Sequence, residues 1–100
     1  MEQSEIRKQS RTVTKETAKV PRKHHVIVLN DDFTTFEFVI SIMMTVFHKT
    51  QEEAYEIAET THLHQRAIVG SYSLDIAESK VAKATEAARA EGFPLSFEID

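Results

Sequence analysis

The stretch LNDDFTTFEF at 29–38 constrains the fold more than any other part of the chain. A short apolar, β-branched run at 26–28 leads straight into a polar turn, and apolar residues then recur at helical spacing. Asn30, Asp31 and Asp32 favour turns and helix caps because their short side chains bond nearby backbone groups. The sequence therefore predicts a strand, an acidic turn and a helix in immediate succession, with negative charge on the rim between them.

A helix is expected to follow this turn. Thr34 and Glu37 have the spacing of a capping box, in which a hydroxyl and a carboxylate satisfy backbone N–H groups that the helix leaves unpaired. Apolar side chains between 36 and 47 recur on two sides at helical spacing, so most of the helix circumference should be buried. The basic pair at 48–49 suits the negative end of a helix dipole, and we therefore predict a helix from Thr35 to this pair.

A second helix and a second strand are predicted next. Thr50 and Glu53 form another capping box, and the helix that they begin should run to about 64, with a mostly apolar inner face. The β-branched and aromatic run at 67–72 has the character of a strand. Gly70 within that strand indicates a bulge or a close approach of two backbones.

The C-terminal part of the chain predicts a third helix and a last strand. Ser73 is expected to cap the helix, alanines between 77 and 88 to form its buried stripe, and Gly92 to end it. Apolar and polar residues alternate at 95–99, as in a strand with one buried face. The order β-α-α-β-α-β predicts an α+β fold: a small three-stranded antiparallel sheet with three helices packed on one side.

The charge distribution separates an N-terminal arm from the rest of the chain. Residues 1–22 hold six basic residues against three glutamates, a net +3, which leaves −7 for the remainder of a chain whose net charge is −4. The arm also has too few large apolar residues to offset the entropy of ordering. We therefore predict a flexible extension at 1–22 and one core domain at 23–100. The acidic core argues against nucleic acid as a partner, whereas the basic arm could contact RNA or an acidic protein, or serve as a solvating linker.

The composition also limits the chemical groups available to the chain and the cellular compartment in which it is expected. The chain has no Cys, which excludes disulfides and thiol nucleophiles and weakly favours a reducing compartment. It has no apolar run long enough for a membrane span, and its N-terminus lacks the apolar core of a secretory signal. We therefore expect a cytoplasmic protein that does not enter a membrane.

Catalytic and metal sites find little support in the sequence. Paired aspartates after a first strand also occur in phosphoacceptor receiver domains, but the next aspartate, Asp75, has the position of a helix cap, and the chain is too short for five βα units. His62 and His64 are two residues apart on a helix and so point to different faces. No serine lies in a recognisable nucleophile motif, and no glycine-rich loop is present. We therefore expect a binding module without enzymatic activity, metal or cofactor.

From His25 onward, the chain resembles the ClpS family, the N-degron adaptors that deliver proteins to an AAA+ protease. The acidic turn, a histidine on the second helix and a terminal Pro-Leu strand occur in the order typical of that family. Four segments carry the resemblance: VIVLNDDFTTFEFVI (26–40), VFHKTQEEA (46–54), THLHQRAIVGSYSLDIAESKV (61–81) and AEGFPLSFE (90–98).

The resemblance implies a binding mechanism. Asn30 and Asp31 would bond the free α-amino group of a substrate, and His62 would help to hold it, directly or through water. The first side chain of the substrate, Phe, Tyr, Trp or Leu, would fill an adjacent apolar pocket. The residues that correspond to the pocket and its rim are Asp32, Thr34, Phe36, Val39, Ala58, Thr61 and Leu95.

Delivery is implied by the same resemblance. The adaptor would act as a monomer and dock on an AAA+ unfoldase of the ClpA type through Asp75 and Lys80, both on the third helix. The unfoldase would engage the N-terminal extension during hand-over. Both docking residues also suit purely structural positions, Asp75 in the first turn of a helix and Lys80 on an exposed face.

Three positions of the pocket depart from the family pattern. The family usually has Met in place of Phe36, and Met and Val in place of Ala58 and Thr61. Phe is larger and stiffer than Met, Ala removes most of a wall, and Thr adds a hydroxyl. We therefore expect the amine site to be retained and the preference for the first residue to be altered.

A second hypothesis is a protein-interaction domain that does not recognise N-degrons. The same fold occurs in the C-terminal domain of the ribosomal stalk protein, which binds factors through its helices. Fold alone therefore does not decide between these two functions, which differ in the residues of the site.

Overall fold

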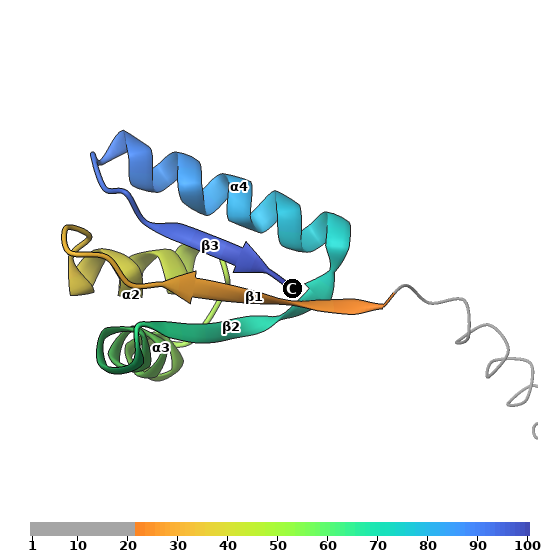
Figure 1. Ribbon diagram of the computed structural model, residues 1–100, viewed down its shortest axis with the longest axis horizontal. Helices are drawn as coiled ribbons and strands as arrows, with labels where there is room; N and C mark the ends of the chain where they lie inside the picture. Colours follow the sequence, from red (N-terminus) through yellow and green to blue (C-terminus); the bar gives the residue numbers. More distant parts are fainter. Residues whose placement is uncertain (1–21) are drawn as a thin grey trace, which may run out of the picture.

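A computed structural model describes residues 22–100 of the chain (Figure 1). Its elements are β1 (Lys23–Leu29), α2 (Phe36–Thr45), α3 (Gln51–His64), β2 (Arg66–Ser73), α4 (Leu74–Ala90) and β3 (Ser96–Ile99). The predicted order β-α-α-β-α-β is confirmed. The arm predicted at 1–22 lies, except for Arg22, outside the described residues, so its flexibility stays a prediction.

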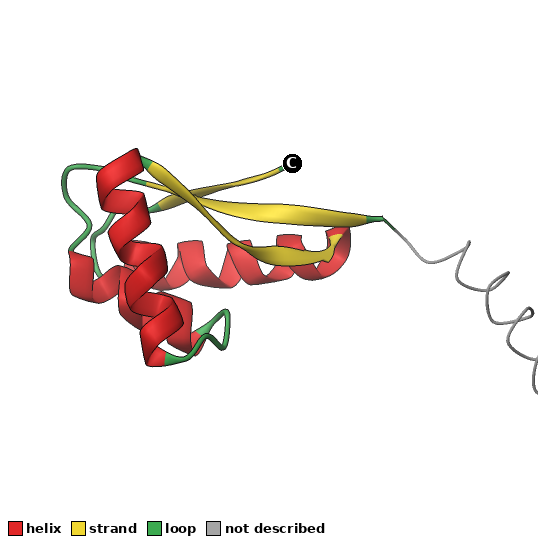
Figure 2. Cartoon of the chain, turned by 90° about the horizontal axis from the view of Figure 1, so that it is seen from below, coloured by secondary structure: helices red, strands yellow, loops and turns green. Residues whose placement is uncertain are grey.

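The three strands form one antiparallel sheet in the order β2-β1-β3. The helices lie on one side of this sheet, as Figure 2 shows, which confirms the predicted α+β architecture. The register between β1 and β2 shifts at Val26, which pairs with Gly70 while Ile27 pairs with Ile68. A bulge therefore lies beside Gly70, as predicted, and the ring of Tyr72 covers this glycine so closely that a Cβ there would lie 2.9 Å from the Tyr72 hydroxyl.

The core lies between the sheet and the helices. Val26 and Val28 of β1 are fully buried, together with Met43 of α2. The helices α3 and α4 present mainly alanines to this core, and small side chains let a helix approach a sheet closely. The buried alanines are Ala54, Ala58, Ala77, Ala84 and Ala88. Among residues 22–100, no helix has the length and apolar character that crossing a bilayer requires.

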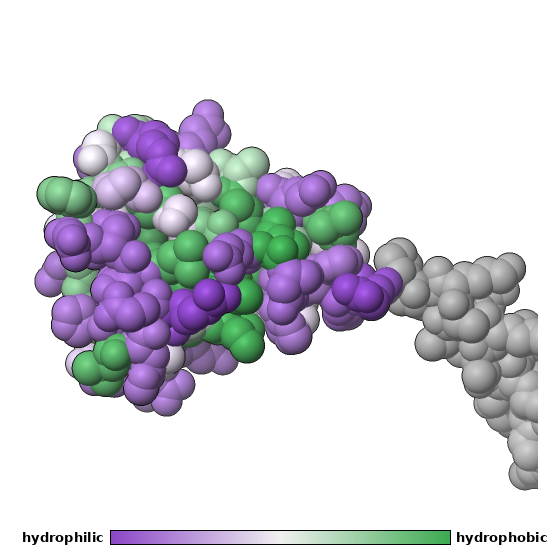
Figure 3. Space-filling model, viewed as in Figure 1, coloured by the Kyte–Doolittle hydropathy of each residue, from purple (hydrophilic) through white to green (hydrophobic). Residues whose placement is uncertain are grey.

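The opposite face of the sheet carries an ion pair over apolar side chains. Arg66 of β2 and Glu98 of β3 are 2.8 Å apart and connect the two outer strands across β1. Ile68 on the same face is 59% exposed, and Figure 3 shows apolar surface over the strands between polar side chains. This face is therefore partly shielded by its own charged side chains.

The start of α2 differs from the prediction. Thr35, not Thr34, is the N-cap, and its hydroxyl accepts a hydrogen bond from Phe38 N at 3.1 Å. The hydroxyl of Thr34 donates instead to Asp31 Oδ2 at 2.8 Å. The capping box predicted for Thr34 and Glu37 is therefore wrong, because the acidic turn engages the hydroxyl that the box needs.

The end of α2 also differs, since the helix stops at Thr45 rather than at 48–49. His48 has a φ of 57°, in the left-handed region, and Lys49 N bonds Met43 O at 3.0 Å across the turn. The ammonium group of Lys80, from α4, bonds the Val46 carbonyl at 3.1 Å. A cation from another helix therefore stabilises this helix end, in place of the predicted basic pair.

The caps of the other two helices fit the predictions better. Thr50 and Glu53 form the predicted capping box of α3, with bonds of 2.9 and 3.1 Å. Ser73 is the N-cap of α4, but its hydroxyl donates to Asp75 Oδ1 at 2.8 Å instead of bonding the helix backbone. Gly92 ends α4 with a φ of 81°, a conformation that favours glycine.

Candidate functional site

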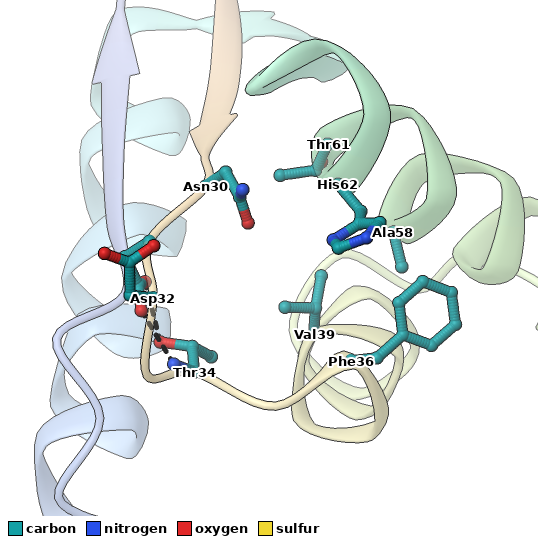
Figure 4. A pocket seen from close by; sticks show the side chains of 9 residues that line it. Asn30, Asp32, Thr34, Phe36, Val39, Ala58, Thr61 and His62 are labelled. Atoms are coloured by element: carbon teal, nitrogen blue, oxygen red, sulfur yellow. Dashed lines mark hydrogen bonds between the residues drawn. The ribbon is translucent and has the colours of Figure 1, made fainter.

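A cavity of about 430 Å³ opens where β1 runs into the acidic turn, opposite the start of α2 and the C-terminal half of α3 (Figure 4). Most of the site residues named from the sequence lie around it, although they come from three separate segments. Its lining consists of Asn30, Asp31, Asp32, Thr34, Phe36, Val39, Ala58, Thr61 and His62. Leu95 alone, of the predicted amine and pocket residues, is not part of this lining, and its side chain is only 1% exposed within the core.

One wall of the cavity is apolar. Val39 and Ala58 contribute buried side chains from α2 and α3. The ring of Phe36 packs edge-to-face against the ring of Tyr55, with centroids 5.4 Å apart and planes at 78°. Tyr55 was not singled out from the sequence, although it lies one helical turn before Ala58. This edge-to-face contact is favourable and packs Phe36 of α2 against α3.

Thr61 contributes less polarity to the cavity than its residue type indicates. Its hydroxyl donates to the Ile57 carbonyl, one turn earlier on α3, at 2.7 Å. Figure 4 shows the oxygen turned toward the helix and the methyl group turned away from it. The hydroxyl that Thr61 was expected to add to the pocket therefore donates its hydrogen to the helix backbone, as Thr commonly does in helices.

Asp31 uses its carboxylate to shape the turn. Its Oδ1 accepts hydrogen bonds from Phe33 N at 2.8 Å and from Thr34 N at 2.7 Å, and its Oδ2 accepts the Thr34 hydroxyl. Partial burial opposes ionisation, but these bonds and the positive charge of Arg89 outweigh it and hold the pKa of Asp31 below its ordinary value. The carboxylate is therefore charged and engaged within the turn.

Arg89, near the end of α4, carries a positive charge that acts on the acidic turn. Its Nη1 donates to the carbonyls of Phe93 and Leu95, both at 2.9 Å, and so fixes the loop between α4 and β3. The same guanidinium lowers the pKa of Asp31 by its charge. Arg89 therefore holds the loop between α4 and β3 by hydrogen bonds and acts on the acidic turn through its charge alone.

Asp32 presents the free carboxylate of the acidic turn. The residue is exposed, and its carboxylate bonds no group in the part of the chain that the structure describes. It is one of the residues that line the cavity. Of the two neighbouring acids, Asp32 therefore has no internal partner among the described residues, whereas Asp31 accepts three hydrogen bonds within the turn.

Asn30 and His62 complete the polar side of the cavity. Asn30 is held by Gln65, which accepts bonds from the Asn30 backbone N–H at 2.9 Å and from its Nδ2 at 3.3 Å. Figure 4 shows the amide oxygen of Asn30 and the imidazole of His62 pointing into the same space. Gln65 carried no signal in the sequence, because glutamine is not a residue type that marks a left-handed helix end.

The cavity combines hydrogen-bond acceptors with an apolar wall. The Asn30 amide oxygen, the Asp32 carboxylate and a neutral His62 ring can each accept a hydrogen bond. Such a set suits a small cation with several N–H donors that is attached to an apolar group. No three metal-ligating side chains gather anywhere in residues 22–100.

The predicted docking residues lie at a separate cavity beside α4. Asp75 is exposed, and hydrogen bonds from the Ser73 hydroxyl and the helix backbone lower the pKa of its carboxyl. Lys80 is half-buried, with its ammonium bonded to Val46 O and 5.6 Å from the centre of the Tyr72 ring. Both residues line this second cavity together with His48 and Lys83.

Comparison with known proteins gives one consistent family. The family model described as ATP-dependent Clp protease adaptor protein ClpS matches residues 19–98. The adapter protein ClpS 1 of Bradyrhizobium diazoefficiens is 40% identical over 87 residues, covering 87% of this chain and 86% of the relative. The ClpS adapter of Acetivibrio thermocellus is 45% identical over 78 residues, covering 78% and 79%. Among solved structures, Agrobacterium tumefaciens ClpS2 bound to L-phenylalaninamide matches with a TM-score of 0.78 at 34% identity, over 81% of this chain and 98% of that one.

Proposed function

The chain belongs to the ClpS family of Clp protease adaptors, and from this premise we propose that it binds the N-terminal residue of N-degron substrates and hands them to a Clp AAA+ unfoldase. One observation carries the proposal: a cavity that places three hydrogen-bond acceptors beside an apolar wall. The structural neighbour from Agrobacterium is bound to L-phenylalaninamide. That ligand has a free amino group and a phenyl side chain, the two features that such a cavity would accommodate.

In the proposed complex, the α-ammonium group faces the amide oxygen of Asn30, the carboxylate of Asp32 and the ring of His62. We assign Asp32 to this contact, and Asp31 to the shape of the turn, because the Asp31 oxygens already accept three hydrogen bonds. The reference pKa of an α-amino group is about 7.7 to 8.0, so the group is mostly charged at neutral pH. A neutral His62 can accept one of its hydrogen bonds without repelling it.

The first side chain of the substrate would fill the apolar part of the cavity. Burial of an aromatic or leucine side chain contributes roughly 1.5 to 3 kcal/mol, and each hydrogen bond to the charged amine about as much. Together these contributions reach the roughly −8 kcal/mol of a micromolar complex only when the pocket needs little reordering. The contact between Phe36 and Tyr55 supports this condition, because it holds one wall in place before a ligand arrives.

The size of residue 58 should control which first residues bind. Ala58 lines the cavity and is 2% exposed, so Ala58→Met adds a flexible side chain to the space that a ligand would use. We expect this variant to shift binding toward the usual preference of the family among Phe, Tyr, Trp and Leu. Fluorescence anisotropy with peptides that differ only in residue one measures the shift.

A matched control for this variant is Ala82→Met, which adds the same side chain to an exposed position of α4. It should leave the order of preference unchanged. An Ala58→Met protein that ranks the peptides as the natural chain does would show that residue 58 is not part of the specificity pocket.

Hand-over to the unfoldase is proposed to use the exposed Asp75 on α4 and the N-terminal extension. Asp75→Arg should leave the affinity for a Phe-starting peptide unchanged and lower the rate at which a Clp unfoldase and protease degrade a Phe-starting reporter. Asp75 gives a cleaner test than Lys80, whose ammonium also holds the end of α2. Ser73→Ala is the control, since it removes only the serine hydroxyl that bonds Asp75.

Degradation and binding must be measured together to interpret this variant. An Asp75→Arg protein that supports degradation at the natural rate would argue against docking through α4. A chain that never increases degradation of the Phe-starting reporter, with any residue at 75, would contradict the adaptor function itself.

A further inference from the structure

We propose that Gln65 is a positioning residue of the amine site, which turns the Asn30 amide so that its oxygen faces the substrate. This inference rests on the proposed function and adds a residue to it. Gln65 lies at the C-cap of α3 with φ 75° and ψ −10°. This left-handed conformation is unfavourable for a residue with a side chain, so glycine or asparagine would suit the backbone better.

Two contacts join Gln65 to Asn30. The Gln65 carbonyl accepts a hydrogen bond from Asn30 N at 2.9 Å, which ties the end of β1 to the end of α3. The Gln65 side chain also bonds the Asn30 side chain, with 3.3 Å between Oε1 and Nδ2. The backbone bond would survive in any variant at position 65, whereas the side-chain bond is specific to a residue that reaches Asn30 and can accept.

The side-chain bond determines what Asn30 offers to a ligand. A primary amide has an acceptor oxygen and a donor NH₂ group of nearly the same shape, and only the oxygen can bond an ammonium group. Because the NH₂ group of Asn30 is directed to Gln65, its oxygen is directed into the cavity (Figure 4). Without this bond, the amide can rotate and present its NH₂ group to the amine, which would repel it.

Position 65 allows a test in which stability and affinity change in opposite directions. Gln65→Gly relaxes the left-handed backbone and deletes the side chain, so it should raise the melting temperature or leave it unchanged. The same variant should weaken binding of a free-amine Phe-starting peptide about three- to tenfold, which is the range of one hydrogen bond to a charged group partly lost. A purely structural role of Gln65 would not produce this combination.

Gln65→Glu is the matched rescue variant. Its carboxylate keeps the reach of glutamine and can only accept a hydrogen bond, so it should hold Asn30 in the same orientation and retain affinity. Titrations at several salt concentrations separate this effect from the added negative charge, because exposed charges are screened by salt. Affinity is measured by fluorescence anisotropy and stability by thermal unfolding, on the full chain.

The outcomes distinguish this inference from the proposed function. The positioning role is supported if the natural chain binds the free-amine peptide, the Gln65→Gly variant binds it more weakly, and the Gln65→Glu variant keeps the natural affinity. Equal affinity of Gln65→Gly and the natural chain, or equal losses in the Gly and Glu variants, would overturn it while leaving the proposed function intact. A natural chain that does not distinguish a free from an acetylated amine would overturn both.

Discussion

The Asp31→Ala variant is expected to lose about 2 kcal/mol in the free energy of unfolding and most of its affinity for Phe-starting peptides. Alanine leaves the backbone N–H groups of Phe33 and Thr34, and the Thr34 hydroxyl, without the acceptor that now orders them. Loss of a single capping side chain typically costs about 0.5 to 2 kcal/mol, and this carboxylate caps a whole turn. Because the turn carries Asn30 and Asp32, a disordered turn would no longer hold these two side chains in position to bind the amine.

Asp31→Asn is the control for this variant, since an amide oxygen can still accept the two backbone N–H groups. It should retain at least half of the lost stability. Chemical denaturation measures the free energy of unfolding, and the same samples are titrated with peptide. Asp31→Ala protein that unfolds and binds like the natural chain would contradict the role assigned to this carboxylate.

The contribution of the Asp31 carboxylate to stability should also depend on pH. The pKa of Asp31 is lower in the folded chain than its ordinary value. Such a group stabilises the fold fully above the unfolded-state pKa, and this contribution is lost as the pH falls through the folded-state pKa. The difference in stability between the natural chain and Asp31→Ala should therefore be largest near neutral pH and shrink in acid.

The second large effect, a loss of peptide affinity, is expected from substitution of the neighbouring acid, Asp32. Asp32→Asn should weaken binding of a free-amine peptide about tenfold or more, since a hydrogen bond to a charged group contributes roughly 1.5 to 3 kcal/mol. The free energy of unfolding should change little, because the Asp32 carboxylate is exposed and bonds no group within residues 22–100. Isothermal titration calorimetry and chemical denaturation measure the two quantities separately.

The contrast between the two acids is the informative result. Asp31 should affect stability and binding together, whereas Asp32 should affect binding alone. If Asp32→Asn bound the peptide as the natural chain does, the carboxylate that faces the amine would have to be sought elsewhere, and the original pairing of Asn30 with Asp31 would regain support.

The architecture could be predicted from sequence because local signals agreed with one another. The capping box of Thr50 and Glu53, the alanine stripe of α4 and the left-handed Gly92 each depend on residues close in the chain. Such signals need no tertiary information. The grouping of the cavity residues from three segments, in contrast, was available only through the resemblance to a known family.

The N-cap of α2 was predicted wrongly because neighbouring side chains compete for the same hydrogen-bond partners. Thr34 and Thr35 are equally good caps by residue type, and the choice between them depends on Asp31 capturing the Thr34 hydroxyl. The same arrangement leaves the Asp32 carboxylate without an internal partner among residues 22–100, which is why we propose Asp32 for the amine contact. The direction of the Thr61 hydroxyl likewise depends on a neighbouring group, the Ile57 carbonyl, to which it donates.

Other features had no sequence signal at all. Gln65 adopts a left-handed conformation that its residue type disfavours, and its bond to Asn30 spans 35 positions of the chain. Leu95 has the inward position that strand alternation predicts, and packing leaves it only 1% exposed within the core. Long-range contacts of this kind have to be read from the structure.

The most direct test compares two peptides that begin with Phe and differ only in acetylation of the α-amino group. Acetylation removes the charge and leaves a single N–H donor, so Asn30, Asp32 and His62 would lose the cation that they are proposed to hold. Titration of the natural chain should give micromolar binding of the free peptide and at least about a hundredfold weaker binding of the acetylated one, the loss of roughly two charged hydrogen bonds. Equal affinities for the two peptides would contradict recognition of a free amino terminus.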